Sequence, residues 1–111
     1  MNKQDTVTAL AALAHEHRLA IFRLLVQAGP EGKAAGEIAE ALDMAPSSLS
    51  FHLAHLNRAG LIAQRRESRS LIYSADFDEM NALIGFLTEN CCGGRSCAPA
   101  AQLAQPKRKR A

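Results

Sequence analysis

The stretch that decides the fold covers residues 36–74 and reads GEIAEALDMAPSSLSFHLAHLNRAGLIAQRRESRSLIYS. Apolar residues at helical spacing predict a short helix over about 35–42 and a second helix over 46–59, joined by a tight link. Pro46 suits the first turn of the second helix, because its missing N–H has no partner there, and Gly60 is a typical C-terminal stop. Two short helices joined in this way predict a helix-turn-helix, in which the second helix projects its polar face outward.

The hydropathy period changes directly after the second helix. Residues 61–66 and 71–74 read as two strands, and the polar segment 67–70 reads as the turn that joins them. The hairpin would form a wing beside the helix-turn-helix. Upstream of the quoted stretch, apolar residues at helical spacing predict two more helices over roughly 5–14 and 16–28.

A last helix is predicted over 77–90, with an apolar stripe along one face. The stripe consists of Met80, Leu83, Ile84 and Leu87. With 111 residues and 48% hydrophobic content, the chain can bury one modest core. An exposed apolar stripe needs a partner, so we expect a dimer. The expected fold is therefore a mainly α, dimeric winged helix-turn-helix with a small β-hairpin over residues 1–90, followed by a flexible, basic, cysteine-containing tail over 91–111.

The second helix and the hairpin carry groups suited to DNA. Short hydrogen-bonding side chains lie near the N-terminal end of the helix, where it can enter a major groove, and arginines on the hairpin suit phosphates or the minor groove. The residues that we expect to bind DNA are Ser47, Ser48, Ser50, His52, His55, Arg65, Arg66 and Arg69. The charge distribution agrees, since residues 44–75 hold four arginines against one glutamate, whereas residues 76–90 hold four carboxylates and no base.

Each of these residues also has a structural interpretation. The serines could be helix caps, and the arginines could form a solvated face of the hairpin. His52 and His55 lie three residues apart and could hold a metal ion, although two imidazoles alone make a poor site. Phe51 is interpreted as a packing residue. His15 and His17 flank a helix start, where we expect a structural role.

The sequence resembles the ArsR-type metalloregulators. Residues 11–25, AALAHEHRLAIFRLL, are similar to the characteristic opening of that family. Residues 36–39, 47–53 and 56–62 match its helix-turn-helix segment, and the resemblance covers about residues 6–90. It implies a winged-helix homodimer, joined through the first and last helices, that represses its own operon until an inducer binds.

The inducer site is where members of this family differ. The founding arsenic sensors carry Cys-x-Cys-x2-Cys in the first helix of the helix-turn-helix, but residues 37–42 contain no cysteine. Zinc sensors use histidines and carboxylates on the last helix, and Asp76, Asp78 and Glu79 lack accompanying histidines there. The cysteines of this chain lie just past that helix and resemble a relocated arsenic site of some relatives. They are Cys91, Cys92 and Cys97.

Three thiolates would select a soft, thiophilic ion. Zinc prefers four ligands, and no histidine or fourth cysteine lies nearby in the sequence to complete such a site. Trivalent arsenic or antimony takes three sulfurs around its lone pair, which matches the count, whereas a methylated trivalent arsenical needs only two. A redox-active thiol pair and incidental tail cysteines remain alternatives.

Other classes of protein are not supported by the sequence. The start of the chain has no apolar signal core, and no run approaches the ~18 apolar residues of a membrane span, so we expect a cytoplasmic protein without a membrane partner. The spacing from Cys91 to Arg95 is Cys-x3-Arg, whereas one class of arsenate reductase needs Cys-x5-Arg, so we expect no enzyme and no catalytic cofactor. The expected partners are double-stranded operator DNA and a second copy of the chain, with trivalent arsenic or antimony as the inducer.

Overall fold

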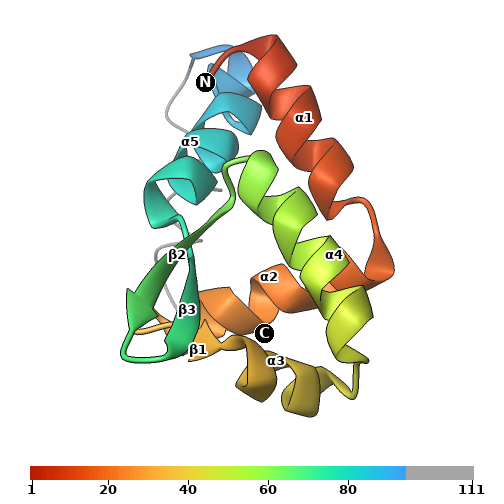
Figure 1. Cartoon of the computed structure of the whole chain (residues 1–111). Coiled ribbons are helices and arrows are strands. Elements are labelled where there is room, and N and C mark those ends of the chain that lie inside the picture. Colours follow the sequence, from red (N-terminus) through yellow and green to blue (C-terminus); the bar gives the residue numbers. More distant parts are fainter. Residues whose placement is uncertain (95–111) are drawn as a thin grey trace, which may run out of the picture.

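The computed structural model describes residues 1–94, which form five α-helices and one three-stranded antiparallel sheet (Figure 1). The elements in chain order are α1 (Lys3–Leu13), α2 (Glu16–Ala28), β1 (Lys33–Ala34), α3 (Ala35–Leu42), α4 (Pro46–Arg58), β2 (Ile62–Glu67), β3 (Ser70–Ala75) and α5 (Phe77–Leu87). A tight turn over Cys91–Gly94 follows. The predicted mainly α winged helix-turn-helix with a small hairpin is confirmed.

Three of the helices begin at a side-chain cap, which satisfies an N–H group that has no partner inside the helix. At the start of α1 the side chain of Asn2 accepts a hydrogen bond from the N–H of Asp5 at 2.7 Å. At the start of α5 Asp76 accepts from the N–H of Glu79 at 3.0 Å, and α2 begins at His15. The cap residue of α4 is Ala45, which has no side-chain acceptor, so this helix starts without a side-chain cap.

The last helix is shorter than the sequence predicts. It ends at Leu87 rather than at Asn90, because the backbone already leaves helical dihedrals at the C-cap Thr88 (φ −102°, ψ 4°) and becomes left-handed at Asn90 (φ 55°). The hydroxyl of Thr88 donates to the carbonyl of Ile84 at 2.8 Å, at the end of the helix. The chain therefore leaves the helix axis before it reaches the cysteines.

The sheet has the strand order β1–β3–β2, and both pairings are antiparallel. Glu67 pairs with Ser70, so the wing tip is a two-residue turn in which Ser68 has a φ of 57°. Strand β1, in which Lys33 pairs with Tyr73, was not predicted. Two residues are too few to show an alternating pattern, so this strand exists only through its pairing with β3.

The core lies where helices α1 to α4 meet α5 and the base of the hairpin. Its buried apolar members are Ala9, Ala12, Ile21, Phe22, Leu25, Ile38, Leu49, Leu53, Leu56, Leu61, Ile62, Ala75 and Leu83. Leu49, Leu53 and Leu56 form an apolar stripe along α4 that is buried, which turns the opposite face of α4 outward. None of the helices within residues 1–94 is both long and apolar enough to cross a lipid bilayer.

The corner between α1 and α2 contains a buried cation. Arg18 is 9% exposed, and its Nε donates to the carbonyl of Ala12 at 2.6 Å. Nearby, Nδ1 of His15 accepts from the N–H of His17 at 3.1 Å, which confirms the structural role expected for His15. A buried charged donor needs such a partner, so the Arg18 bond fixes the direction in which α2 leaves α1.

We predict that Gly32→Ala destabilises the fold by about 1–3 kcal/mol. Gly32 has a φ of 73°, and a Cβ there would collide with the backbone carbonyl of Tyr73, which lies in the central strand. The matched control is Gly36→Ala in α3, where a Cβ meets no atom within 4 Å and should stabilise by about 0.5–1 kcal/mol. Urea unfolding followed by circular dichroism measures both values, and equal stability of the two variants would contradict the prediction.

Candidate nucleic-acid interface

The start of α4 and the tip of the β2–β3 hairpin lie toward the same end of the molecule, and the start of α1 lies toward the other end (Figure 1). Ser47, Ser48 and Ser50 are exposed near the start of α4. Because the cap residue of this helix is Ala45, none of the three serines is its N-cap, and their hydroxyls are available to an external partner.

The expectation that His52 projects outward with these serines is wrong. Its side chain is 8% exposed and faces the corner between α1 and α2. At about 100° per residue, His52 lies beside the buried Leu49–Leu56 stripe rather than opposite to it. The α1–α2 corner covers that flank of α4, so His52 is not a surface group.

Three histidine rings gather at this corner. The ring centroid of His52 lies 4.7 Å from that of His15 and 5.7 Å from that of His17, and the last two are 5.6 Å apart. Nδ1 of His52 is buried and has no hydrogen-bond partner within residues 1–94. The sequence motif His15-x-His17-Arg18 placed two of these groups together, but their proximity to His52 depends on the tertiary packing of α4.

The protonated form of His52 is disfavoured in this environment. Burial lowers the pKa of His52 below 6.5, and the positive charges of His15, His17, Arg18 and His55 lower it further. The imidazole is therefore neutral at physiological pH, which agrees with its position in the packed corner.

His55 lies one turn farther along α4 and is half-buried, so it remains accessible to a partner. Desolvation lowers the pKa of His55, and the charges of Arg18, Arg58 and His15 act in the same direction. A neutral imidazole offers one donor and one acceptor, which suits hydrogen bonding to a base edge or a phosphate.

The wing arginines divide into two kinds. Arg66 and Arg69 are exposed on β2 and in the turn at the tip. Arg65 has partners within the chain, since its Nη2 donates to the carbonyl of Glu31 at 2.8 Å and its Nε contacts Oε2 of Glu67 at 2.9 Å. Arg65 therefore connects the wing to the turn before β1, a role that sequence spacing did not indicate.

The interpretation of Phe51 as a packing residue is wrong, because its side chain is 64% exposed. Its position about 200° around the helix from Leu49 places it on the outer face of α4. Helical periodicity could have shown this, but a large apolar residue suggested a core position.

Two of the predicted thiol ligands lie in the turn after α5. Cys91 is half-buried and Cys92 is exposed, and Cys92 has a left-handed φ of 59°. Within residues 1–94 no group of three or more His, Cys, Asp or Glu side chains is placed to hold a metal ion. The third predicted ligand, Cys97, lies outside the described residues, so the structure leaves the three-thiol set as a prediction.

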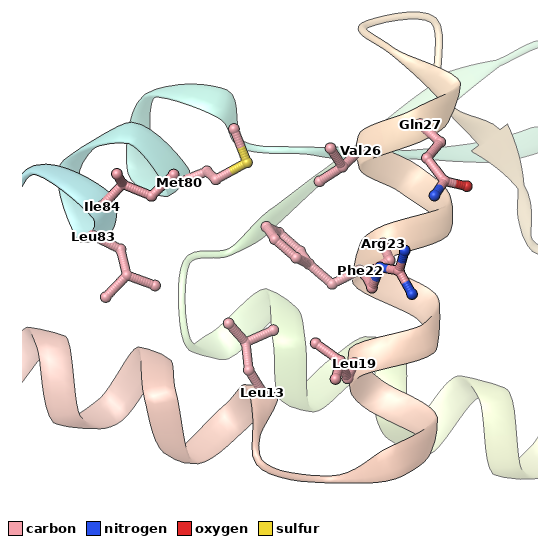
Figure 2. A pocket seen from close by; sticks show the side chains of 9 residues that line it. All are labelled: Leu13, Leu19, Phe22, Arg23, Val26, Gln27, Met80, Leu83 and Ile84. Atoms are coloured by element: carbon pink, nitrogen blue, oxygen red, sulfur yellow. The ribbon is translucent and has the colours of Figure 1, made fainter. Parts of the chain in front are cut away.

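An apolar groove of about 340 Å³ separates α2 from α5 (Figure 2). It is lined by Leu13, Leu19, Phe22, Arg23, Val26, Gln27, Met80, Leu83 and Ile84. In Figure 2 the apolar side chains of α2 point toward those of α5. Within the predicted apolar stripe of α5, Ile84 at the groove and Leu87 are exposed, and Val7 and Leu10 of α1 are exposed as well.

We predict that the free energy of unfolding decreases as the pH falls below about 6.5 toward the lowered pKa of His52. The unfolded chain keeps an ordinary histidine pKa and binds the proton more readily, so acid favours unfolding. His52→Gln should reduce the slope of stability against pH, whatever its effect on absolute stability. His17→Gln removes one neighbouring charge and should give an intermediate slope. Urea unfolding from pH 7.5 to 5.5 measures this, and a wild-type slope in His52→Gln would contradict it.

Comparisons with known proteins agree with this geometry. A family model described as a helix-turn-helix domain matches residues 13–65. The transcriptional activator HlyU of Vibrio cholerae is 34% identical over 91 residues, covering 82% of this chain and 82% of that protein. The transcriptional regulator YgaV of Escherichia coli is 32% identical over 89 residues, covering 80% and 88% respectively.

Solved structures match over a similar part of the chain. Reduced HlyU from Vibrio cholerae has a TM-score of 0.65 at 34% identity, covering 82% of this chain and 93% of that chain. A second match is the homodimeric winged helix-turn-helix DNA-binding domain Mb0332 from Mycobacterium bovis, a possible ArsR-family regulator. Its TM-score is 0.62 at 27% identity, and the match covers 85% of this chain and 87% of that chain.

The matched relatives are transcriptional regulators, so the expectation that this chain is not an enzyme is confirmed. Identity above 30% extends over about four-fifths of the sequence, and the winged fold is shared. The chain therefore belongs to the ArsR/HlyU family of DNA-binding winged helix-turn-helix transcriptional regulators.

Proposed function

We propose that this chain is a cytoplasmic, homodimeric repressor that leaves its double-stranded operator when trivalent arsenic or antimony binds Cys91, Cys92 and Cys97. One observation carries the proposal. Cys91 and Cys92 follow the end of α5 after only three intervening residues, 88–90, and the exposed apolar face of α5 has the character of a dimer surface. A ligand bound at this point can act on the subunit interface without contacting the DNA-reading helix.

The dimer surface of the proposal is formed by α1 and α5, which contact one another. Val7 of α1 and Leu87 of α5 are 59% and 58% exposed, and Leu10 of α1 and Ile84 of α5 are exposed as well. Large apolar side chains gathered in this way favour burial against a second copy. The Mycobacterium bovis neighbour is described as homodimeric, which supports the same arrangement here.

In the proposed complex two copies of α4 enter successive major grooves of a palindromic operator. Ser47, Ser48, Ser50 and His55 are the accessible hydrogen-bonding groups for base edges and phosphates. Arg66 and Arg69 on the wing would bind phosphates. His52 supports the helix from inside, and Arg65 supports the wing, so neither belongs to the proposed contact set.

The proposed inducer chemistry is thiol exchange at trivalent arsenic. With the three cysteines in the reduced thiol form, arsenous acid, As(OH)3, would exchange its three hydroxyls for three cysteine sulfurs. Each S–H proton would leave with one hydroxyl as water, so three As–S bonds form, three water molecules are released and no oxidation state changes. Gly93 and Gly94 have φ values of 69° and 89°, which only glycine adopts freely, so the chain can reverse direction between the cysteine pair and Cys97. The three As–S bonds would restrain the chain at the end of α5 and so change the spacing between the two copies of α4 in the dimer.

A thiol-redox switch on the same frame is the second candidate. Cys92 is exposed, and an accessible thiol is open to oxidation. The structure of HlyU of Vibrio cholerae has been solved in a reduced form, which supports testing whether this chain responds to oxidation. A sensor for methylated trivalent arsenicals would need only two of the three sulfurs.

We predict that Arg66→Ala and Arg69→Ala weaken binding to duplex DNA of any sequence. Each phosphate contact that is lost should make the slope of log K against log salt shallower by about 0.9. Lys3→Ala is the matched control, because it removes the same charge at the start of α1, away from the wing tip (Figure 1). Fluorescence anisotropy across a salt series measures the slopes. Arginine variants that keep the wild-type slope would show that the wing does not contact phosphate.

We predict that arsenite weakens DNA binding of the wild-type chain by about 5–150-fold, the range of common allosteric couplings. The assay uses the full chain, a phosphine reductant and a duplex enriched by the protein from a random library. The triple variant Cys91→Ser, Cys92→Ser, Cys97→Ser should bind that duplex as the wild type does and ignore arsenite. Cys92→Ser alone should lose the response to arsenite, and a remaining response to methylarsonous acid would indicate a two-sulfur site.

The same titration distinguishes the two candidates. Release of the triple cysteine variant by arsenite would overturn the three-thiol site. If arsenite has no effect on the wild type, but diamide releases the DNA and a reductant restores binding, the redox candidate replaces the arsenic proposal.

A further inference from the structure

Phe51 is an exposed aromatic residue on the helix assigned to the DNA. Its side chain is 64% exposed, although burial of a phenyl ring is strongly favourable in water. The other exposed large apolar side chains within residues 1–94 lie at the N-terminus and on α1, α2 and α5. They are Met1, Val7, Leu10, Leu19, Ile84 and Leu87. Phe51 does not belong to that surface, so the proposed dimer gives it no role.

The position of Phe51 on α4 points to the DNA side. It lies one turn after Ser47 and one turn before His55, so the three residues share one face of the helix. Leu49, on the opposite face, is buried in the core. When the polar residues of this face approach a major groove, the phenyl ring enters it with them.

The ring is held in place by the corner beneath it. Its centroid lies 5.5 Å from that of His52, with an angle of 69° between the planes, which is an edge-to-face contact. His52 is itself buried against His15. One edge of Phe51 is therefore supported while the rest is open, so the ring loses little conformational freedom when it binds a partner.

The major groove offers one apolar group to such a ring, the C5-methyl of thymine. We infer that Phe51 packs against a thymine methyl in each operator half-site and is a specificity-determining residue of this regulator. Cytosine at the same position lacks the C5-methyl and presents an N4 amino donor, which a phenyl ring accepts only weakly, so the ring also discriminates against C. The inference rests on the proposed placement of α4 in the major groove.

The test uses the full chain and duplexes that the wild type enriches from a random library. Each thymine of an enriched duplex is replaced in turn by deoxyuridine, which differs only by the absence of the methyl group. At one thymine per half-site the replacement should weaken wild-type binding about fourfold, the change expected for loss of one buried methyl. Phe51→Ala should be insensitive at that position, and Phe51→Leu, which remains apolar, should keep part of the effect.

The outcomes separate this inference from the proposed function. Suppose that the wild type enriches a duplex, but every thymine-to-deoxyuridine replacement lowers the DNA affinity of the wild type no more than that of Phe51→Ala. The role of Phe51 is then overturned, and the DNA-binding assignment stands. If the wild type enriches no duplex, both fall. Unfolding curves of Phe51→Ala and Phe51→Leu check that the variants are folded, as expected for substitutions at an exposed position.

Discussion

Burial of the leucine stripe of α4 against the helices beneath it is the constraint on which the rest of the structure depends. Leu49 and Leu53 are almost completely buried and Leu56 is fully buried, and a leucine transferred from water to a core contributes about 1.5–3 kcal/mol. Because all three lie on one face, the helix can sit in only one rotation about its axis. That rotation turns Ser47 and Phe51 outward and places His52 against the α1–α2 corner.

The corner under α4 is the second determinant, and it depends on a buried charge. Arg18 donates to the carbonyl of Ala12, and this bond holds α1 and α2 in the orientation that brings His15 to His52. Protonation of His52 is disfavoured at this contact, since burial and neighbouring positive charge both oppose its charged form. The packing of α4 against the α1–α2 corner is thus linked to pH through the buried His52, which lies outside the DNA-facing surface.

The two ends of the molecule differ in chemistry. The start of α4 and the wing tip lie toward one end, and the start of α1 lies toward the other (Figure 1). The first end presents hydroxyls, an imidazole and arginines, whereas α1 and α5 present exposed apolar side chains. In the proposed mechanism the cysteines act on the apolar end, where Cys91 follows α5. In that proposal a change there would reach the DNA by moving one subunit against the other, because a closely packed core transmits displacements as a unit.

The sequence by itself determined the five helices, the hairpin and the family, because helical and strand periodicities, Pro46 and Gly60 are local signals. It also identified Ser47, Ser48, Ser50, His55, Arg66 and Arg69 as candidate contact residues, and the structure leaves all of them accessible. Only the tertiary structure decided the remainder. His52 is buried because the α1–α2 corner, distant in sequence, covers its side of α4. Arg65 donates a hydrogen bond to the carbonyl of Glu31, which lies 34 residues away in the sequence. Strand β1 forms because β3 offers it an edge, and no local pattern encodes such pairings between distant segments.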